Sequence, residues 1–323
     1  EYSLFLNSEK VPKKVYDYFS GKHNESEIIH YNEYSLYLMG LGDKVEWDNL
    51  YENMDKVVKK IYSLSVKKIQ IILTCSNLDL ELIVNSFILC FYRYYDYKTV
   101  DTQYYDKEVY FVVDFDEEEK CKLSIEMGNI INEIRTLTNS PRNEMNVDNL
   151  ASHISEVGLE NELYVDIYNE SKLKQMGCNL ILGVGNGSIN RPKLIVIHYN
   201  NRGDTQPIVL VGKGVMFDSG GYNIKGSSMF GMYDDMYGSV LVYGIIRVCK
   251  LYDIPINIVG ICPLVENMVS DKAQRPSDIV KAYNGTTVEI GDTDAEGRLI
   301  MADAIALSKK YNPVMIIGMA TMT

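Results

Sequence analysis

The stretch that decides the fold of this chain is VLVGKGVMFDSGG, residues 209–221. It begins as an aliphatic run typical of a buried strand and then breaks into a glycine-rich loop. Lys213 and Asp218 lie five residues apart at that break. Because ligands of open α/β sheets gather at the carboxyl ends of strands, both side chains are candidates for chemistry. On its own, such a lysine is more often a salt-bridge partner.

A second stretch, TVEIGDTDAEGRL at residues 287–299, repeats the order of strand, turn and acidic residues before an apolar helix. We expect Asp294 and Glu296 to converge, with Arg298 close behind, because residues i and i+2 of an extended chain project to the same side. Several carboxylates in a confined place repel one another unless cations neutralise them. Oxygen-rich sites of this kind suit divalent ions such as Mg, Mn or Zn.

The same segment offers an alternative, a calcium-binding EF-hand loop. DTDAEG at residues 292–297 resembles the start of that loop. However, Glu296 stands at its fifth position, and Asp303 stands at its twelfth, where a bidentate Glu is expected. The preceding residues also indicate a strand, where an EF-hand has a helix. Calcium binding is therefore the weaker interpretation.

Other catalytic motifs are absent from the sequence. The four histidines form no HExxH pair, and no GxSxG stretch occurs. GVGNGS at 183–188 does not match GxGxxG, and GKG at 212–214 lacks the rest of a P-loop, so both indicate turns. The six cysteines include no CxxC pair and are expected to be reduced and mostly buried.

The length of the chain and its net charge limit the number of domains and the class of partner. The chain has 323 residues, enough for two domains, and a formal net charge of −12. That charge argues against a nucleic-acid partner, which needs a basic surface. No secretory signal pattern opens the sequence, and the apolar run 82–95 is too short to span a bilayer and is expected to be a buried helix. We therefore expect a cytoplasmic protein with no membrane partner.

The hydrophobic pattern predicts two α/β domains, a smaller one over residues 1–130 and a larger one over 131–323. The larger one contains all of the candidate residues and is therefore expected to be the catalytic domain. In the first, helices are expected at 47–64, at 78–95 and from the acidic run 114–120 to about Thr136, with strands at 69–75 and 109–113. In the second, strands are expected at 180–184, 194–198, 208–211, 256–262 and 314–319. Helical stretches between these runs indicate a mixed, mostly parallel sheet flanked by helices.

Together, the segments resemble the leucyl aminopeptidase (cytosol aminopeptidase) family. The resemblance rests on VGKGVMFDSGGYNIK (211–225), DDM (234–236) and GDTDAEGRLIMADA (291–304). Supporting stretches are TNSPRNEM (138–145), GVGNGS (183–188) and ENMVSDKAQRPSDIV (266–280). The similarity is strong over residues 137–323 and weak before them.

The resemblance implies two divalent metal ions, drawn from Zn, Mn, Mg and Co. The implied ligands are Lys213, Asp218, Asp235 and Glu296 for one ion, and Asp218, Asp294 and Glu296 for the other. As a ligand, Lys213 must be neutral, and nearby dications and the removal of water both favour loss of its proton. Two such ions activate a water molecule for attack on a peptide carbonyl.

The resemblance also implies roles around the metals. Lys225 would stabilise an oxyanion, and Arg298 would hold a bicarbonate ion that relays protons. Met232 and Thr321 would line an apolar pocket for the first side chain. The implied substrates are short peptides with free N-termini, preferably Leu-like, and the implied assembly is a homo-hexamer of the full-length protein.

Departures from the family pattern leave one alternative open. Asp292 stands where the family usually has Asn, Tyr237 replaces a small residue, and Gly318 replaces Asp or Asn. The loop between Lys225 and Asp235 is about one residue short of the family pattern. The chain also stops inside an apolar run, so we expect further C-terminal residues. The alternative is a catalytically weakened relative that acts as a metal-binding scaffold or binding subunit.

Overall fold

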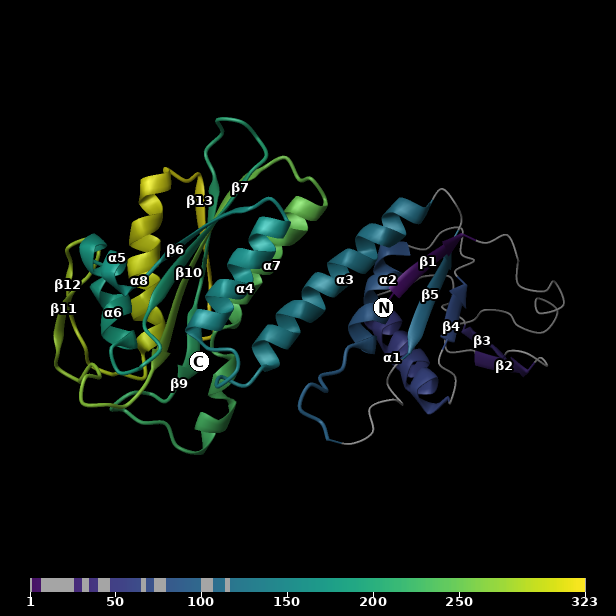
Figure 1. Ribbon diagram of the computed structural model, residues 1–323, viewed down its shortest axis with the longest axis horizontal. Coiled ribbons are helices and arrows are strands. Elements are labelled where there is room, and N and C mark those ends of the chain that lie inside the picture. Colours follow the sequence, from purple (N-terminus) through teal and green to yellow (C-terminus); the bar gives the residue numbers. More distant parts are fainter. Residues whose placement is uncertain are drawn as a thin grey trace. The chain divides into compact units, whose positions relative to one another are not determined.

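The computed structural model describes residues 2–6, 26–30, 35–39, 47–64, 68–72, 80–99, 107–113 and 117–322. The chain separates into two compact units, Glu1–Asn132 and Glu133–Thr323 (Figure 1). The division falls inside the long helix α3 (Glu118–Asn139).

The first unit contains a parallel three-stranded sheet in the order β1 (Tyr2–Leu6), β5 (Glu108–Val113), β4 (Lys68–Ile72). It also has an antiparallel pair, β2 (Ser26–His30) and β3 (Ser35–Met39). The helices expected at 47–64 and 78–95 are confirmed as α1 (Trp47–Ser63) and α2 (Leu80–Phe91). Of the strand expected at 69–75, residues 73–75 lie outside the described residues.

Helical spacing explains the packing of this unit. Leu50, Met54, Val58 and Ile61 of α1 are buried together with the apolar residues of α2 and β5. A stripe at this spacing lies on one face of a helix. The run 82–95, expected to be a buried helix, is helical and mostly buried as far as Phe91, where α2 ends, and is not helical over 92–95. No described helix is both long and apolar enough to cross a membrane.

A six-stranded mixed sheet forms the centre of the second unit. Its order is β13 (Met315–Met319), β8 (Ile208–Gly212), β10 (Asn257–Asn267), β7 (Lys193–Asn200), β6 (Tyr164–Tyr168), and β9 (Gly214–Asp218) also pairs with β10. Three of the five strand pairings are parallel, which confirms the expected mixed, mostly parallel sheet. All residues of β10 are buried, as expected for a central strand.

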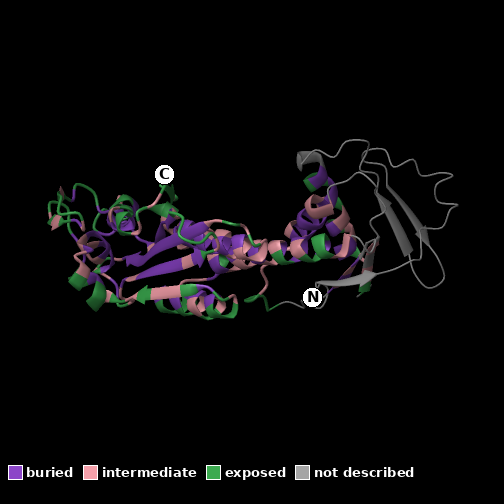
Figure 2. Cartoon of the chain, turned by 90° about the horizontal axis from the view of Figure 1, so that it is seen from above, coloured by how far each residue is buried: buried purple, intermediate pink, exposed green. Residues whose placement is uncertain are grey.

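Helices cover both faces of this sheet. Figure 1 shows α4 (Val147–Glu160) and α7 (Tyr237–Leu251) on one side. The short helices α5 (Glu170–Met176) and α6 (Asn179–Gly185) lie with α8 (Glu296–Ser308) on the other. Side chains from α6, α8 and the central strands form one core cluster, and Figure 2 shows the strands as the buried interior. A small hairpin of β11 (Ile279–Lys281) and β12 (Thr287–Glu289) leads toward α8.

The strand expected at 180–184 is wrong, because these residues form α6. Leu180, Ile181 and Val184 are buried at helical spacing. The side chain of Cys178 gives no cap to the helix, but the buried Asp303 carboxylate accepts the N–H groups of Leu180 and Ile181 at 2.8 and 3.2 Å. Short apolar runs do not distinguish a strand from a helix by periodicity. Here the acceptor that stabilises the helix start is Asp303, 123 residues from Leu180.

The described cysteines fit the expectation of buried thiols. Cys90, Cys121, Cys178, Cys249 and Cys262 are free and buried. Cys75 lies outside the described residues.

Candidate metal centre

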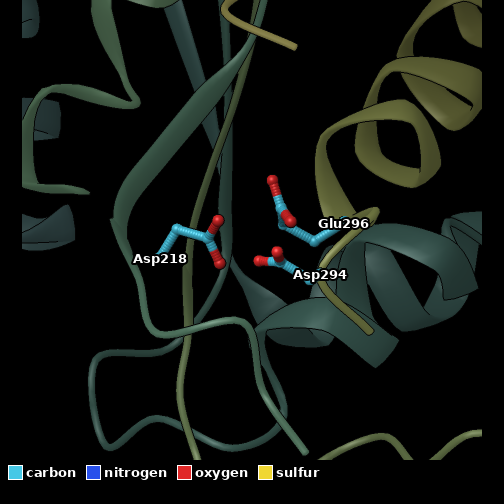
Figure 3. A group of neighbouring side chains, drawn as sticks. All are labelled: Asp218, Asp294 and Glu296. Carbon is cyan, nitrogen blue, oxygen red and sulfur yellow. The ribbon is translucent and has the colours of Figure 1, made fainter. Parts of the chain in front are cut away.

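Three carboxylates converge where β9 ends and α8 begins. Oxygen atoms of Asp218, Asp294 and Glu296 lie within 4.8 Å of one another. Figure 3 shows the three groups turned toward a common point. Asp218 and Glu296 are each 2% exposed, while the Asp294 side chain is 33% exposed. The cluster is therefore buried on two sides and open at Asp294.

Asp218 owes its direction to an irregularity in the sheet. The pairing of β9 with β10 shifts register between Val265 and Glu266, so that Asp218 comes to lie opposite Asn267. Bulges of this kind re-aim side chains and are frequent beside active sites. Gly220 follows with φ of +86°, which glycine adopts readily, and its N–H donates to Asp218 Oδ1 at 2.9 Å.

The expected convergence of Asp294 and Glu296 occurs, but the local geometry differs from the extended chain we expected. Ala295 occupies the N-cap position, with φ of −107° and ψ of 36°, and Glu296 is the first residue of α8. Asp292 Oδ1 accepts the N–H of Asp294 at 2.8 Å and stabilises the turn. In a helix, residues two positions apart point about 200° apart around the axis. This explains why Arg298 is exposed while Glu296 is buried.

Lys213 brings a fourth carboxylate into the cluster. It lies between β8 and β9 and is 4% exposed. Its Nζ is 2.7 Å from Asp235 Oδ2 and 3.0 Å from Glu296 Oε1. It also donates to the carbonyl oxygen of Thr321 at 2.7 Å. Asp235 comes from the end of the 3₁₀ helix η4 (Ser227–Asp234), so four separate chain segments meet at this lysine.

Lys225 faces the open side of the cluster. Its Nζ is 2.8 Å from Asp218 Oδ2 and 2.5 Å from Asp294 Oδ1. Burial would lower the pKa of Lys225, but hydrogen bonds to Asp218 and Asp294 and their negative charge outweigh burial and raise this pKa above its ordinary value. Lys225 therefore remains a cation.

Burial is the largest influence on the pKa of two buried carboxyl groups of the cluster, Glu296 and Asp235. It raises the pKa of Glu296 to about 7, helped by the negative charge of Asp218 and partly opposed by Lys213. Burial also raises the pKa of Asp235 against the opposing effect of Lys213. Burial therefore makes the ionised form of these carboxyl groups less favourable, and a cation bound beside them would make it more favourable.

The residues present fit divalent ions. The cluster contains four carboxylates and two lysines, Asp218, Asp235, Asp294 and Glu296 with Lys213 and Lys225, so negative charge is in excess. Glu296 Oε2 is buried and has no hydrogen-bond partner within the described part of the chain. Such an oxygen is costly unless a cation or donor meets it. Carboxylate oxygens with one amine suit hard or borderline divalent metals.

Of the three remaining predicted site residues, Thr321, Met232 and Arg298, the structure shows a bond to the carboxylate cluster for Thr321. The Thr321 hydroxyl donates to Asp235 Oδ1 at 2.6 Å, so this residue contacts the cluster directly. Met232 is half-buried in η4, three residues before Asp235. Arg298 is on the exposed side of the first turn of α8. The roles implied for these residues stay predictions.

The calcium-loop alternative does not fit. Asp303, its twelfth position, is fully buried in α8. Its Oδ2 accepts the N–H groups of Leu180 and Ile181, and its Oδ1 accepts that of Tyr283 at 2.8 Å. The segment before the loop contains strand β12. Asp303 is therefore a structural residue that joins α8 to α6.

Several residues beside the cluster were not singled out from the sequence. Asn267 donates to Asp218, Thr293 and Asn223 bond to each other, and Gly297 lies against Lys213. Asn267 belongs to the ENM stretch that supported the family resemblance, but no chemical pattern distinguished it there.

Proteins of a known family are similar to this chain in sequence. Residues 132–323 match the model of the cytosol aminopeptidase family, catalytic domain. A probable cytosol aminopeptidase of Geobacter sp. (strain M21) is 41% identical over 191 residues, 58% of this chain and 39% of that protein. Another, of Blochmanniella floridana, is 33% identical over 332 residues, 94% of this chain and 66% of that protein. The chain thus spans less than two thirds of these relatives' length.

Solved structures share the fold. The bottromycin maturation enzyme BotP in complex with Mn superposes with a TM-score of 0.83 at 23% identity, covering 100% of this chain and 72% of that one. The matched residues 132–323 are more than half of the chain and contain all of the converging carboxylates and both lysines. The chain therefore belongs to the cytosol aminopeptidase family.

Proposed function

We propose that this chain belongs to a two-metal aminopeptidase that removes N-terminal, preferably Leu-like, residues from short peptides. The observation that carries the proposal is the convergence of four carboxylates on one buried lysine and one cationic lysine. Membership of the cytosol aminopeptidase family gives this cluster its chemical context.

Two groups of side chains would hold the ions. Asp218, Asp294 and Glu296, whose oxygens lie within 4.8 Å of one another, form the first group. Lys213 and Asp235, 2.7 Å apart, form the second together with Asp218 and Glu296. Lys213 must lose its proton to act as a ligand, which exchanges its ion pairs for a metal bond. The ions would supply an activated water molecule and polarise the peptide carbonyl.

The chain's own residues account for the other requirements of the reaction. Lys225 remains cationic beside Asp218 and Asp294, where it can stabilise negative charge that develops on the carbonyl oxygen. Arg298, exposed on the first turn of α8, is proposed to hold bicarbonate for proton transfer. Met232 and Thr321 are proposed to contact the first side chain of the peptide, which gives the preference for apolar residues.

An assay on the full-length protein tests the proposal. We expect hydrolysis of a leucine aminocoumarin amide that rises with added Mn, Co, Zn or Mg and is lost after chelation. Asp294→Ala should abolish turnover, whereas Asp204→Ala, at an exposed position, should not change it. Because BotP, which shares the fold, was solved in complex with Mn, this ion is the first to test. Full activity after complete metal removal would contradict the proposal.

The alternative of a catalytically weakened scaffold has less support in the structure than in the sequence. Tyr237, one of the unusual residues, is 40% exposed on the first turn of α7. Asp292, another, is exposed and stabilises the turn before Glu296 through the N–H of Asp294. Normal binding of two metals without turnover of any Leu peptide would favour the scaffold.

Assembly and location follow from family membership as further proposals. We expect the full-length protein to be a cytoplasmic homo-hexamer, which light scattering of the purified protein would test. A monomeric mass at micromolar concentration would contradict the hexamer and leave the metal centre unaffected.

A further inference from the structure

Asn267 connects the two segments that carry the carboxylates. It is the last residue of β10 and is 5% exposed. Its Nδ2 donates to Asp218 Oδ1 at 2.8 Å and to the carbonyl oxygen of Thr293 at 3.0 Å. A side-chain amide has two N–H donors, so both are used. One side chain thus joins the end of β9 to the residue directly before Asp294.

The backbone of Asn267 strengthens this connection. Its carbonyl oxygen accepts the N–H of Ser219 at 3.0 Å and the Ser219 hydroxyl at 2.7 Å. The register shift between β9 and β10 places Asp218 opposite Asn267. Asn267 therefore holds both the backbone after Asp218 and the Asp218 carboxylate itself.

Thr293 extends the connection on the other side. Its hydroxyl donates to the carbonyl oxygen of Gly220 at 2.7 Å and accepts the N–H of Asn223 at 2.8 Å. The N–H of Thr293 in turn donates to Asn223 Oδ1 at 3.0 Å. The 218–223 and 293–294 segments are consequently held by a closed set of hydrogen bonds in which Asn267 is the only member from β10 among these described residues.

The chemistry of an amide suits this position. Asp218 Oδ1 accepts hydrogen bonds from Gly220 N and Asn267 Nδ2, which leaves Oδ2 as the oxygen that faces Lys225. An amide supplies these donors without adding charge to a cluster that already has excess negative charge. An aspartate here would provide no donor and would repel Asp218.

We propose that Asn267 is a positioning residue that sets the direction of Asp218 and its distance from Asp294, and so determines metal affinity at the site those residues share. The inference rests on the proposed two-metal centre. Residues that orient metal ligands change metal affinity by about 10–100-fold when they are replaced.

Asn257 offers a matched control. It is the first residue of the same strand and is 6% exposed. Its Nδ2 donates to the carbonyl oxygens of Gly203 and Thr205, both at 2.8 Å. Asn257→Ala therefore removes the same kind of buried amide from the same strand without touching a carboxylate of the cluster.

The experiment is titration of the metal-free full-length protein with Mn²⁺ alone, followed by calorimetry, with thermal unfolding measured in parallel. Asn267→Ala should weaken one of two Mn²⁺ sites by about 10–100-fold. Asn257→Ala should lower the unfolding temperature at least as much, because Asn257 Oδ1 also accepts the N–H groups of Asn201 and Arg202. It should leave both dissociation constants within about twofold, because its bonds are remote from the ligands. Asn267→Ser, which keeps one donor, should give an intermediate loss and serves if the alanine variant does not fold.

The outcomes separate this inference from the proposed function. Two unchanged Mn²⁺ sites in a folded Asn267→Ala or Asn267→Ser variant would overturn the positioning role. Equal weakening by Asn257→Ala would also overturn it, because the effect would then be one of general stability. Failure of the unaltered protein to bind two Mn²⁺ ions would instead refute the two-metal centre.

Discussion

Gly297 lies directly against the side chain of Lys213. A Cβ atom on Gly297 would stand 2.5 Å from Cε and 2.8 Å from Nζ of the lysine. These distances are too short for real contacts, so only glycine lets the lysine reach Asp235 and Glu296 in this geometry.

Gly297→Ala should therefore displace the Lys213 amine and lower kcat/KM by at least about tenfold, a change of about 1.4 kcal/mol in the barrier. Steady-state hydrolysis of a leucine amide, with bound metal measured on the same samples, checks this. Gly291→Ala is the control, because a Cβ there meets no atom within 4 Å. Equal activity of the two variants would show that the close approach has no functional consequence.

Lys225 should contribute to turnover more than to substrate binding. Lys225→Met removes the cation beside Asp218 and Asp294, and loss of one stabilising group of this kind lowers kcat by about 10²–10³-fold. We expect KM to change little. Lys272→Met, at an exposed position, is the control. A kcat within twofold of the unaltered protein would exclude Lys225 from oxyanion stabilisation.

Glu133 should make the stability of the larger unit depend on pH. Burial alone would raise the pKa of Glu133, but the hydrogen bond with His153 and the charge of Arg247, with Tyr243 also bonded, lower it from 4.5 to about 2. Because the folded-state pKa is lowered, the stabilisation is complete above pH 4.5 and is lost as pH falls toward 2. The full shift corresponds to about 3 kcal/mol, and solvent screening of the partly exposed side chain reduces it.

Urea unfolding of the metal-free protein between pH 3 and 7 measures this contribution. Glu133→Gln should flatten the fall in unfolding free energy at acid pH, whereas Glu160→Gln, at an exposed position, should preserve it. Identical pH profiles for Glu133→Gln and the unaltered protein would refute the assignment.

Asp303 should be a stability residue without a direct chemical role. Asp303→Ala leaves the N–H groups of Leu180, Ile181 and Tyr283 without their acceptor in the interior. We expect the free energy of unfolding to fall by about 2–4 kcal/mol. Chemical denaturation measures it, with the exposed Asp204→Ala as the comparison. A loss below about 0.5 kcal/mol, the usual range for surface changes, would contradict the buried anchor.

The sequence predicted the strand β8 that precedes Lys213, because aliphatic runs before glycine-rich breaks are informative by themselves. The loop expected after it is wrong in part, because Gly214–Asp218 form a second strand, β9, whose last residue is Asp218. The sequence also predicted that Asp294 and Glu296 converge, but through an extended chain, whereas the turn into α8 achieves it. That turn depends on Asp292 and on bonds between Thr293 and Asn223, which no local pattern indicates.

Positions that depend on distant partners could not be predicted. Residues 180–184 become helical because Asp303 accepts N–H groups at their start. Asn267 meets Asp218 only through a register shift between two strands, and register is a property of the assembled sheet. The ligand and substrate roles came from the family resemblance.

Diffraction from crystals of the full-length protein soaked in Mn²⁺, recorded with the anomalous signal of that metal, tests the central claim most directly. We expect two anomalous peaks, one within bonding distance of Asp218, Asp294 and Glu296 and the other within bonding distance of Lys213, Asp218, Asp235 and Glu296. A single peak, or a Lys213 amine still paired with Asp235 and bound to no metal, would contradict the central claim.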